Sequence, residues 1–254
     1  MLGVGLGSQP TTECGIFSSN FCLELDGNSD YVNLPVAMGA SLNNGTISCW
    51  VNIRDNDGAS SQSIVRISND SSNENVTLQF HRSNTEFRAV YKIGGTYKEA
   101  TYNDASLDLA GYIAQGWIHL AMTWESDGDG TGQVIMYFNG TAQETVSQTS
   151  NWDNDSNPID TITVGSTDAG AGSFTDGFID QLAIYDVPLN VSDISEVYNG
   201  GVLQDLSTVQ GRRGSYTASG LIGYYQFENN AKDSSGGGHD GTLVGTAGFN
   251  TSQP

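Results

Sequence analysis

The sequence predicts an all-β protein, built as a two-sheet antiparallel β-sandwich with one short helix. Apolar and polar residues alternate with a period of two in many short runs, as they do in strands that bury one face. Turn residues separate these runs, and the 254-residue chain contains 32 Gly, which a long helical bundle would tolerate poorly. About fourteen such runs are too many for one open sheet, so two facing sheets with jelly-roll connections are expected.

The first half of the chain predicts an extended segment followed by a β-meander. Residues 1–20 are rich in Gly, Ser and Thr without periodicity, which indicates an extended N-terminal arm. The runs that follow are each bounded by Asn, Ser, Asp or Gly, the usual limits of short strands. Strands are expected at 21–26, 30–34, 45–53, 62–68, 76–82, 86–92 and 96–102.

The clearest pattern is the hairpin from Trp117 to Gly140. Residues 118–124 place four apolar side chains on one face of a strand, and residues 134–138 repeat the same period. Asn139-Gly140 is the strongest short signal for a type I′ turn, because both central residues of that turn take positive φ. A return strand is therefore expected over 142–146.

One segment of the second half changes from a period of two to the period of a helix. Ile194, Val197 and Tyr198 fall at i, i+3 and i+4, which predicts a short helix. Ser192 is its expected N-cap, and Gly200 stands just after its end.

The remaining strands of the second half complete the expected sandwich. They are separated by polar or Gly-rich loops. The sandwich is therefore expected to span residues 21–245, with 246–254 as a tail. The strands are expected at 161–165, 177–186, 221–227 and 242–244.

The charge of the chain argues against two classes of partner. Lys and Arg number 9 against 29 Asp and Glu, which gives a net charge of −20. Phosphate backbones and anionic membranes would be repelled, so we expect neither nucleic-acid binding nor membrane insertion. No apolar run approaches the ~20 residues that span a bilayer. Cations and neutral ligands remain as candidates.

Four segments, in chain order, resemble the laminin-G-like, concanavalin A-like lectin-glucanase jelly-roll family. The resemblance covers roughly residues 21–202, and its pieces are specific when taken together. They are FCLELDGNSDYVNLP at 21–35, TISCWVNI at 46–53, the hairpin from WIHLAMTWE to MYFNG, and GFIDQLAIYDVPLNVSDISEVYNGG at 177–201.

The chain departs from the family in the order of one segment. LIGYYQFENNAKDSSGGGHDGTLVG, at 221–245, resembles the segment that usually stands first in the family, yet it comes last here. We expect a permuted order, with strand 221–227 filling the vacant position, because about thirty residues cannot form a second sandwich. This layout is similar to laminin-G-like structural proteins of tailed bacteriophages.

The resemblance implies a structural Ca²⁺ near the first strands. The aspartate at the G-x-I-D position, Asp180, would hold it together with Asp26 and Asp30 and with backbone oxygens. Ca²⁺ takes six to eight oxygen ligands, which carboxylates and turn carbonyls supply. The alternative is that Asp26 and Asp30 cap the turn at Gly27 while Asp180 accepts from backbone amides.

A shallow glycan site is the second candidate. Trp152 is the one Trp in a wholly polar loop, and Asn154 and Asp155 stand beside it as hydrogen-bonding groups. With Tyr91 or Tyr97 from a neighbouring strand, these residues would offer an aromatic face and polar groups to a sugar. The alternative is that Trp152 folds back and covers a sheet edge.

The sequence does not predict an enzyme. A laminarinase-like hydrolase needs paired carboxylates on one strand face, whereas Glu125, Asp127 and Asp129 run into a Gly-rich turn. We therefore predict a non-enzymatic surface-recognition or structural protein. The resemblance favours a phage virion component (capsid decoration, fibre or tail-associated) that contacts other virion proteins or its own copies through the N-terminal arm. A secreted or cell-surface module that binds glycans is the alternative, and a glycoside hydrolase relative comes third.

Overall fold

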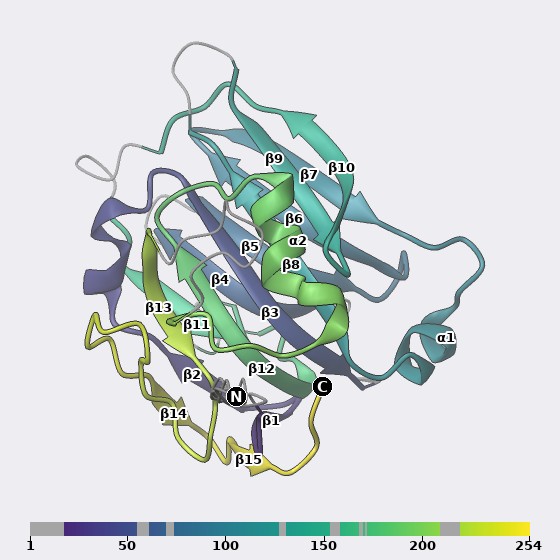
Figure 1. Cartoon of the computed structure of the whole chain (residues 1–254). Helices are drawn as coiled ribbons and strands as arrows, with labels where there is room; N and C mark the ends of the chain where they lie inside the picture. Colours follow the sequence, from purple (N-terminus) through teal and green to yellow (C-terminus); the bar gives the residue numbers. More distant parts are fainter. Residues whose placement is uncertain are drawn as a thin grey trace, which may run out of the picture.

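Two antiparallel β-sheets face each other and enclose the core (Figure 1). This confirms the predicted β-sandwich. None of the described helices combines the length and the apolar character that crossing a membrane requires. The computed structural model describes residues 18–54, 61–69, 74–126, 131–152, 158–167, 170, 172–208 and 219–254.

The larger sheet has eight strands within the described residues. Its order is β10-β9-β8-β3-β12-β1-β15, and β13 pairs with β12 beside this path. The strands are β1 (Cys22–Asp26), β3 (Gly45–Ile53), β8 (Ile118–Trp124), β9 (Gln133–Phe138), β10 (Thr141–Ser147), β12 (Asp176–Tyr185), β13 (Leu221–Tyr225) and β15 (Gly248–Asn250).

The smaller sheet has seven strands in the described part of the chain, in the order β14-β2-β11-β4-β5-β6-β7. Three of its strands, β4, β5 and β6, form a continuous antiparallel run with β7 at one edge. The strands are β2 (Tyr31–Asn33), β4 (Ser61–Asn69), β5 (Glu74–His81), β6 (Glu86–Ile93), β7 (Thr96–Tyr102), β11 (Thr161–Val164) and β14 (Thr242–Val244).

The two-residue period of β8 explains how the larger sheet is buried on both faces. Leu120 and Met122 point between the sheets and are fully buried in the main core. Ala121 points the other way and packs in a second cluster with Ile194 and Val197 of the helix α2 (Val191–Tyr198). The helix therefore covers the outer face of the larger sheet (Figure 1). Each large apolar side chain buried in this way contributes about 1.5–3 kcal/mol.

The turn at Asn139-Gly140 has the predicted conformation, because φ is 47° at Asn139 and 74° at Gly140. The Asn139 side chain also accepts a hydrogen bond from the backbone N–H of His119 at 2.9 Å. The turn therefore ties β9 back onto β8 and fixes the register of the hairpin.

The helices differ from the sequence prediction at two points. The N-cap of α2 is Asn190 and not Ser192, because the Asn190 side chain accepts from the N–H groups of Ser192 and Asp193. The sequence analysis also missed α1 (Leu109–Ala114), a helix of six residues capped by Asp108. Two short 3-10 helices, η1 (Val36–Ser41) and η2 (Asn199–Gly201), lie in loops.

The C-terminal part of the chain joins both sheets. As predicted for 221–227, β13 pairs with β12, and Tyr225 and Phe227 lie in the core. The prediction of a tail over 246–254 is wrong in part, because β15 pairs with β1. The physical reason is that Phe249 packs against the core, opposite Leu23, and this burial holds the segment in the sheet.

Most of the predicted N-terminal arm, residues 1–17, lies outside the described residues. At its end, Ser19 and Asn20 donate hydrogen bonds to the same oxygen of Glu228, each at 2.7 Å. The N-terminal and C-terminal segments are thus joined next to β1.

Candidate functional site

Asp26, the first predicted calcium ligand, caps the turn after β1. One of its carboxylate oxygens accepts from the backbone N–H groups of Asn28, Ser29 and Asp30 at 2.9, 3.0 and 3.1 Å. Burial alone would raise the pKa of Asp26, but these N–H groups of Ser29, Asn28 and Asp30 lower it below its ordinary value. Asp26 is therefore an exposed carboxylate that stays charged well below neutral pH.

Asp30, the second predicted ligand, joins this turn to the C-terminal segment. It is only 3% exposed, and one carboxylate oxygen accepts from the Thr246 backbone N–H at 2.6 Å and from its hydroxyl at 3.1 Å. A buried carboxylate needs such donors, since burial without hydrogen bonds is costly. Asp30 therefore stabilises the bend that leads into β15.

Asp180, the third predicted ligand, lies too far away to join them. In the pairing of β1 with β12, Leu23 lies opposite Ile179 and Asp26 lies opposite Asp176. The same register places Asp180 opposite Cys22, which is four residues before Asp26 on β1. Four residues of a strand span roughly 13 Å. Asp180 is fully buried and accepts from the backbone N–H of Gln181 at 2.7 Å.

The described residues therefore do not fit the predicted calcium ion. Asp26 and Asp30 already accept hydrogen bonds, Asp180 is apart, and no group of three or more His, Cys, Asp or Glu in the described ranges is placed to hold a metal. The alternative role considered for these aspartates is the one shown by the contacts of Asp26, which caps the turn, and of Asp180, which accepts from a backbone amide, whereas Asp30 accepts from Thr246 and not from the Gly27 turn.

The residues predicted to bind a glycan do not form one surface. Trp152 is 2% exposed and lies in the core, and Tyr91 is fully buried with its hydroxyl donating to Ser150 O at 2.9 Å. The prediction of a binding role is wrong for both, because a buried ring cannot stack on a ligand. Tyr97 is 51% exposed, with its hydroxyl 2.7 Å from Glu99. Asn154 and Asp155 lie outside the described residues.

A polar pocket lies where the end of β1 meets the start of β15. We call it the β1/β15 pocket, and its volume is about 240 Å³. It contains two of the three predicted aspartates together with residues from β3's end and from the C-terminal segment. Its lining residues are Glu24, Asp26, Asp30, Arg54, Thr246, Gly248 and Phe249.

Arg54 is held rigidly at the wall of this pocket. Its guanidinium donates to Asp176 at 2.7 Å, to Glu24 at 3.2 Å and to the backbone oxygen of Leu25 at 2.8 Å. It also lies over the ring of Phe178, 4.7 Å from the ring centre. Glu24 is in turn fixed by Asn250 of β15, whose side-chain amide donates to it at 2.9 Å.

The pocket combines the features of a site for a small polar ligand. Fixed carboxylates and the Thr246 hydroxyl offer hydrogen bonds, while the half-buried ring of Phe249 supplies an apolar wall. Its volume lies below the ~300–1,000 Å³ of pockets for drug-sized ligands. The arrangement suits a single sugar ring, which carries both hydroxyl groups and apolar C–H faces.

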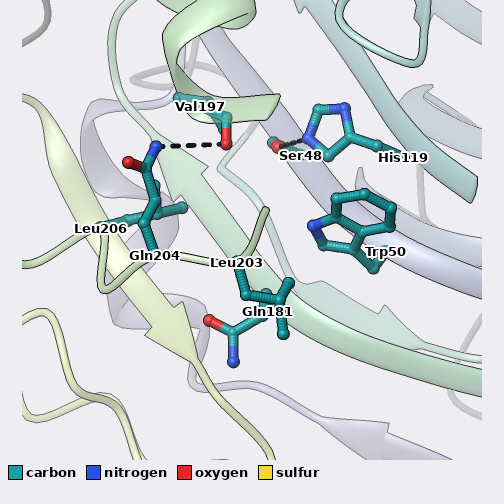
Figure 2. A pocket seen from close by; sticks show the side chains of 8 residues that line it. All are labelled: Ser48, Trp50, His119, Gln181, Val197, Leu203, Gln204 and Leu206. Carbon is teal, nitrogen blue, oxygen red and sulfur yellow. Dashed lines mark hydrogen bonds between the residues drawn. The ribbon is translucent and has the colours of Figure 1, made fainter. Parts of the chain in front are cut away.

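A second pocket lies under α2 and contains a buried Ser–His pair (Figure 2). Ser48 Oγ and His119 Nε2 are hydrogen-bonded at 2.9 Å, and burial lowers the pKa of His119 to about 3. The cavity volume is about 10 Å³, which is room for about one water molecule. A substrate does not fit there, so this pair does not form an active site.

Glu125, the first of the acidic residues weighed against a hydrolase-like site, lies at the base of a hairpin. The Glu125 backbone N–H donates to Gln133 O at 2.9 Å, at the base of the β8–β9 hairpin. Asp127 and Asp129 lie outside the described residues.

The two facing antiparallel sheets, with a helix over one outer face and a polar pocket at one edge, define a lectin-type β-sandwich. The family model for the concanavalin A-like lectin/glucanases superfamily, of the laminin G type, matches residues 26–195. The chain belongs to this family. A comparison with curated protein sequences found no match.

Solved structures share this fold at low sequence identity. A protein from Bacteroides ovatus described as carbohydrate binding matches with a TM-score of 0.61 and 15% identity, over 92% of this chain and 60% of that one. A heptameric SAP-like pentraxin from Limulus polyphemus matches with a TM-score of 0.51 and 13% identity, over 89% and 94%. The CBM40 module of a Ruminococcus gnavus sialidase, solved with α2,3-sialyllactose, matches with a TM-score of 0.51 and 15% identity, over 69% of this chain and 96% of that one. The chain thus spans less than two thirds of the first of these proteins.

Sequence reasoning missed most residues of the β1/β15 pocket. Arg54 stands at the end of an apolar strand, and Thr246 and Phe249 lie in the segment predicted as a tail. The one available signal was the alternation of apolar and polar residues around Phe249. A strand of three residues is too short for this pattern to be distinct.

Proposed function

We propose that this protein is a non-enzymatic recognition module that binds a carbohydrate at the β1/β15 pocket. The observation that carries the proposal is the pocket itself, where rigid polar groups and the ring of Phe249 surround about 240 Å³. Membership of a lectin-type family supports it, and so do two proteins of similar fold, the Bacteroides ovatus protein described as carbohydrate binding and the CBM40 module solved with sialyllactose.

The non-enzymatic part of the proposal is supported by the placement of the acidic residues. Asp26 and Asp30 hold backbone N–H groups, and Arg54 is engaged by Glu24 and Asp176. Each of these groups is held by contacts within the fold, whereas a general acid or nucleophile needs a carboxyl group aimed at the reacting bond. The pocket is therefore suited to hold a ligand and not to cleave it.

In its more specific form, the proposal places this recognition module on a phage particle. It rests on the resemblance to laminin-G-like phage proteins, with the N-terminal arm contacting other virion proteins or further copies of the chain. In that setting the pocket would present a glycan site on the particle. An extracellular glycan-binding module is the alternative setting, and both predict the same ligand site.

The pocket offers one residue where binding can be blocked with little effect on the fold. Gly248 lines the pocket, and an added Cβ would meet only Thr246 O, at an ordinary 3.7 Å. Gly248→Leu should therefore fill the pocket while β15 stays paired.

The test is a glycan-array screen followed by titration calorimetry of the sugars that bind. Wild-type protein should bind at least one sugar, and Gly248→Leu should lose that binding at an unchanged melting temperature. Equal binding by the two proteins, or no binding to any sugar by the wild type, would overturn the proposed site.

A further inference from the structure

We infer that the β1/β15 pocket prefers a sugar that carries a positively charged amino group over neutral and anionic sugars. This inference rests on the proposed function and adds the charge class of the ligand. The evidence is the set of charged side chains that line the pocket and the hydrogen bonds and ion pairs that each of them already forms.

The positive charge in the pocket wall is already neutralised. Arg54 forms ion pairs with Glu24 at 3.2 Å and with Asp176 at 2.7 Å, and its remaining contact is a backbone oxygen. Two carboxylates therefore hold the one guanidinium among the lining residues, and the guanidinium is stacked on Phe178. A carboxylate or sulfate of a ligand would have to compete with both partners, which makes an anionic sugar a poor ligand.

The negative charges on the other side of the pocket are not offset in this way. Asp26 and Asp30 accept hydrogen bonds from backbone N–H groups and from the Thr246 hydroxyl, none of which carries a charge. Asp26 is exposed, and its second oxygen has a contact of 3.5 Å with Ser29 Oγ, at the limit of a hydrogen bond. Because a carboxylate oxygen accepts more than one hydrogen bond, this oxygen keeps acceptor capacity for a ligand.

An ammonium group matches this environment better than a hydroxyl group does. It donates three hydrogen bonds and carries a charge, so it gains from a charge-assisted hydrogen bond to the exposed Asp26, whereas a hydroxyl donates one bond without charge. The net charge of −20 on the whole chain favours the same choice, because it raises the local concentration of cations and lowers that of anions. The apolar wall of Phe249 serves a sugar of any charge and does not discriminate among them.

The experiment compares three sugars of one size by titration calorimetry at pH 6 and low salt. Glucosamine carries an ammonium group, glucose is neutral, and glucuronic acid is anionic. We expect glucosamine to bind about two- to fivefold more tightly than glucose, the range of an exposed ion pair. Glucuronic acid should bind most weakly, and the advantage of glucosamine should fall as salt is added.

Two variants separate the charge effect from a change in structure. Asp26→Asn keeps an oxygen that accepts the N–H groups of the turn but removes the charge, so the variant should bind glucosamine no more tightly than glucose. The matched control is Asp108→Asn, which removes another exposed charge, outside the pocket. Asn also serves as a helix N-cap there, so the preference should persist.

The outcomes distinguish this inference from the proposed function. If glucose binds as tightly as glucosamine, or glucuronic acid binds best, the charge preference is refuted while the sugar site stands. If both Asp variants lower the affinity for glucosamine equally, the charge effect is long-range and the assignment to Asp26 is refuted. If none of the sugars binds and Gly248→Leu changes nothing, the proposed function itself fails, and the inference with it.

Discussion

The buried carboxyl group of Asp180 gives a sharp prediction about stability and pH. Asp180 is fully buried on β12, beside Cys22 of β1, and accepts hydrogen bonds from the backbone N–H of Gln181 at 2.7 Å and from its side-chain amide at 3.5 Å. Burial raises its pKa to about 7, and the charge of Glu228 adds to this rise, although the Ser19 hydroxyl and the Gln181 N–H oppose it. In the unfolded chain the same group has a pKa near 3.9.

The sign of the effect follows from these two pKa values. Because the folded-state pKa is the higher one, the folded protein binds the proton more tightly than the unfolded chain. The resulting stability is fully present below about pH 4 and is lost as the pH rises to about 7. One pKa step corresponds to about 1.4 kcal/mol, so the full loss is about 4 kcal/mol, of which about 2 to 3 kcal/mol falls between pH 5 and pH 8.

The perturbation is Asp180→Asn, which keeps an oxygen for the Gln181 N–H and removes the titration. Urea unfolding of wild type and variant should be compared at pH 5 and at pH 8. Relative to wild type, the free energy of unfolding of the variant should rise by about 2 to 3 kcal/mol on going from pH 5 to pH 8.

The control is Asp104→Asn. The hydroxyl and N–H of Ser106 lower the pKa of Asp104, so this carboxyl is ionised at both pH values and the variant should show no such change. A constant difference between Asp180→Asn and wild type at the two pH values would refute the reasoning.

Three further predictions test other parts of the structure. Trp152→Ala should cost about 3–5 kcal/mol in unfolding free energy, because a core ring is lost, and should leave sugar affinity unchanged; weaker binding at unchanged stability would restore the surface role of Trp152. Deleting residues 246–254 should lower the free energy of unfolding by at least about 3 kcal/mol, because Phe249 leaves the core and Asp30 loses its Thr246 donors. A truncated chain that melts at the same temperature as the full protein would contradict the placement of β15. A calcium chelator should leave the melting temperature unchanged, since the three aspartates are apart, and a lowered melting temperature would show that calcium is bound after all.

The strands were predictable where alternation was long and the turn chemistry was distinct. The limits of β3 and β7 agree with the predicted 45–53 and 96–102, and the Asn139-Gly140 turn has the expected conformation. In β3 several buried apolar residues fix the register, because a shift by one residue would turn them all to the opposite face. In β7 the one buried residue is Ala100.

The short elements were not predictable in the same way. α1 has six residues with Gly111 among them, so neither helix propensity nor periodicity marks it, and its Asp108 cap is its one local signal. β15 has three residues, and it is held by contacts of Phe249 and Asn250 with β1 that no local pattern records.

The candidate site was predictable only in part, because it is assembled from distant segments. Asp26 and Asp30 were identified from the resemblance, but Arg54 and Thr246, which line the same pocket, lie far away in the sequence. Sheet closure brings them together, and sequence spacing does not report it. Trp152 shows the opposite error, since a polar loop suggested exposure while tertiary packing buries the ring.

The central claim is that the β1/β15 pocket is where this lectin-type sandwich holds its ligand. The most direct measurement is a crystal structure of the protein soaked with the tightest-binding sugar of the array. The account predicts the sugar between Asp26 and the ring of Phe249, with a hydrogen bond to the Asp26 carboxylate. A sugar bound elsewhere, for example over the exposed ring of Tyr97, with this pocket unchanged, would contradict it.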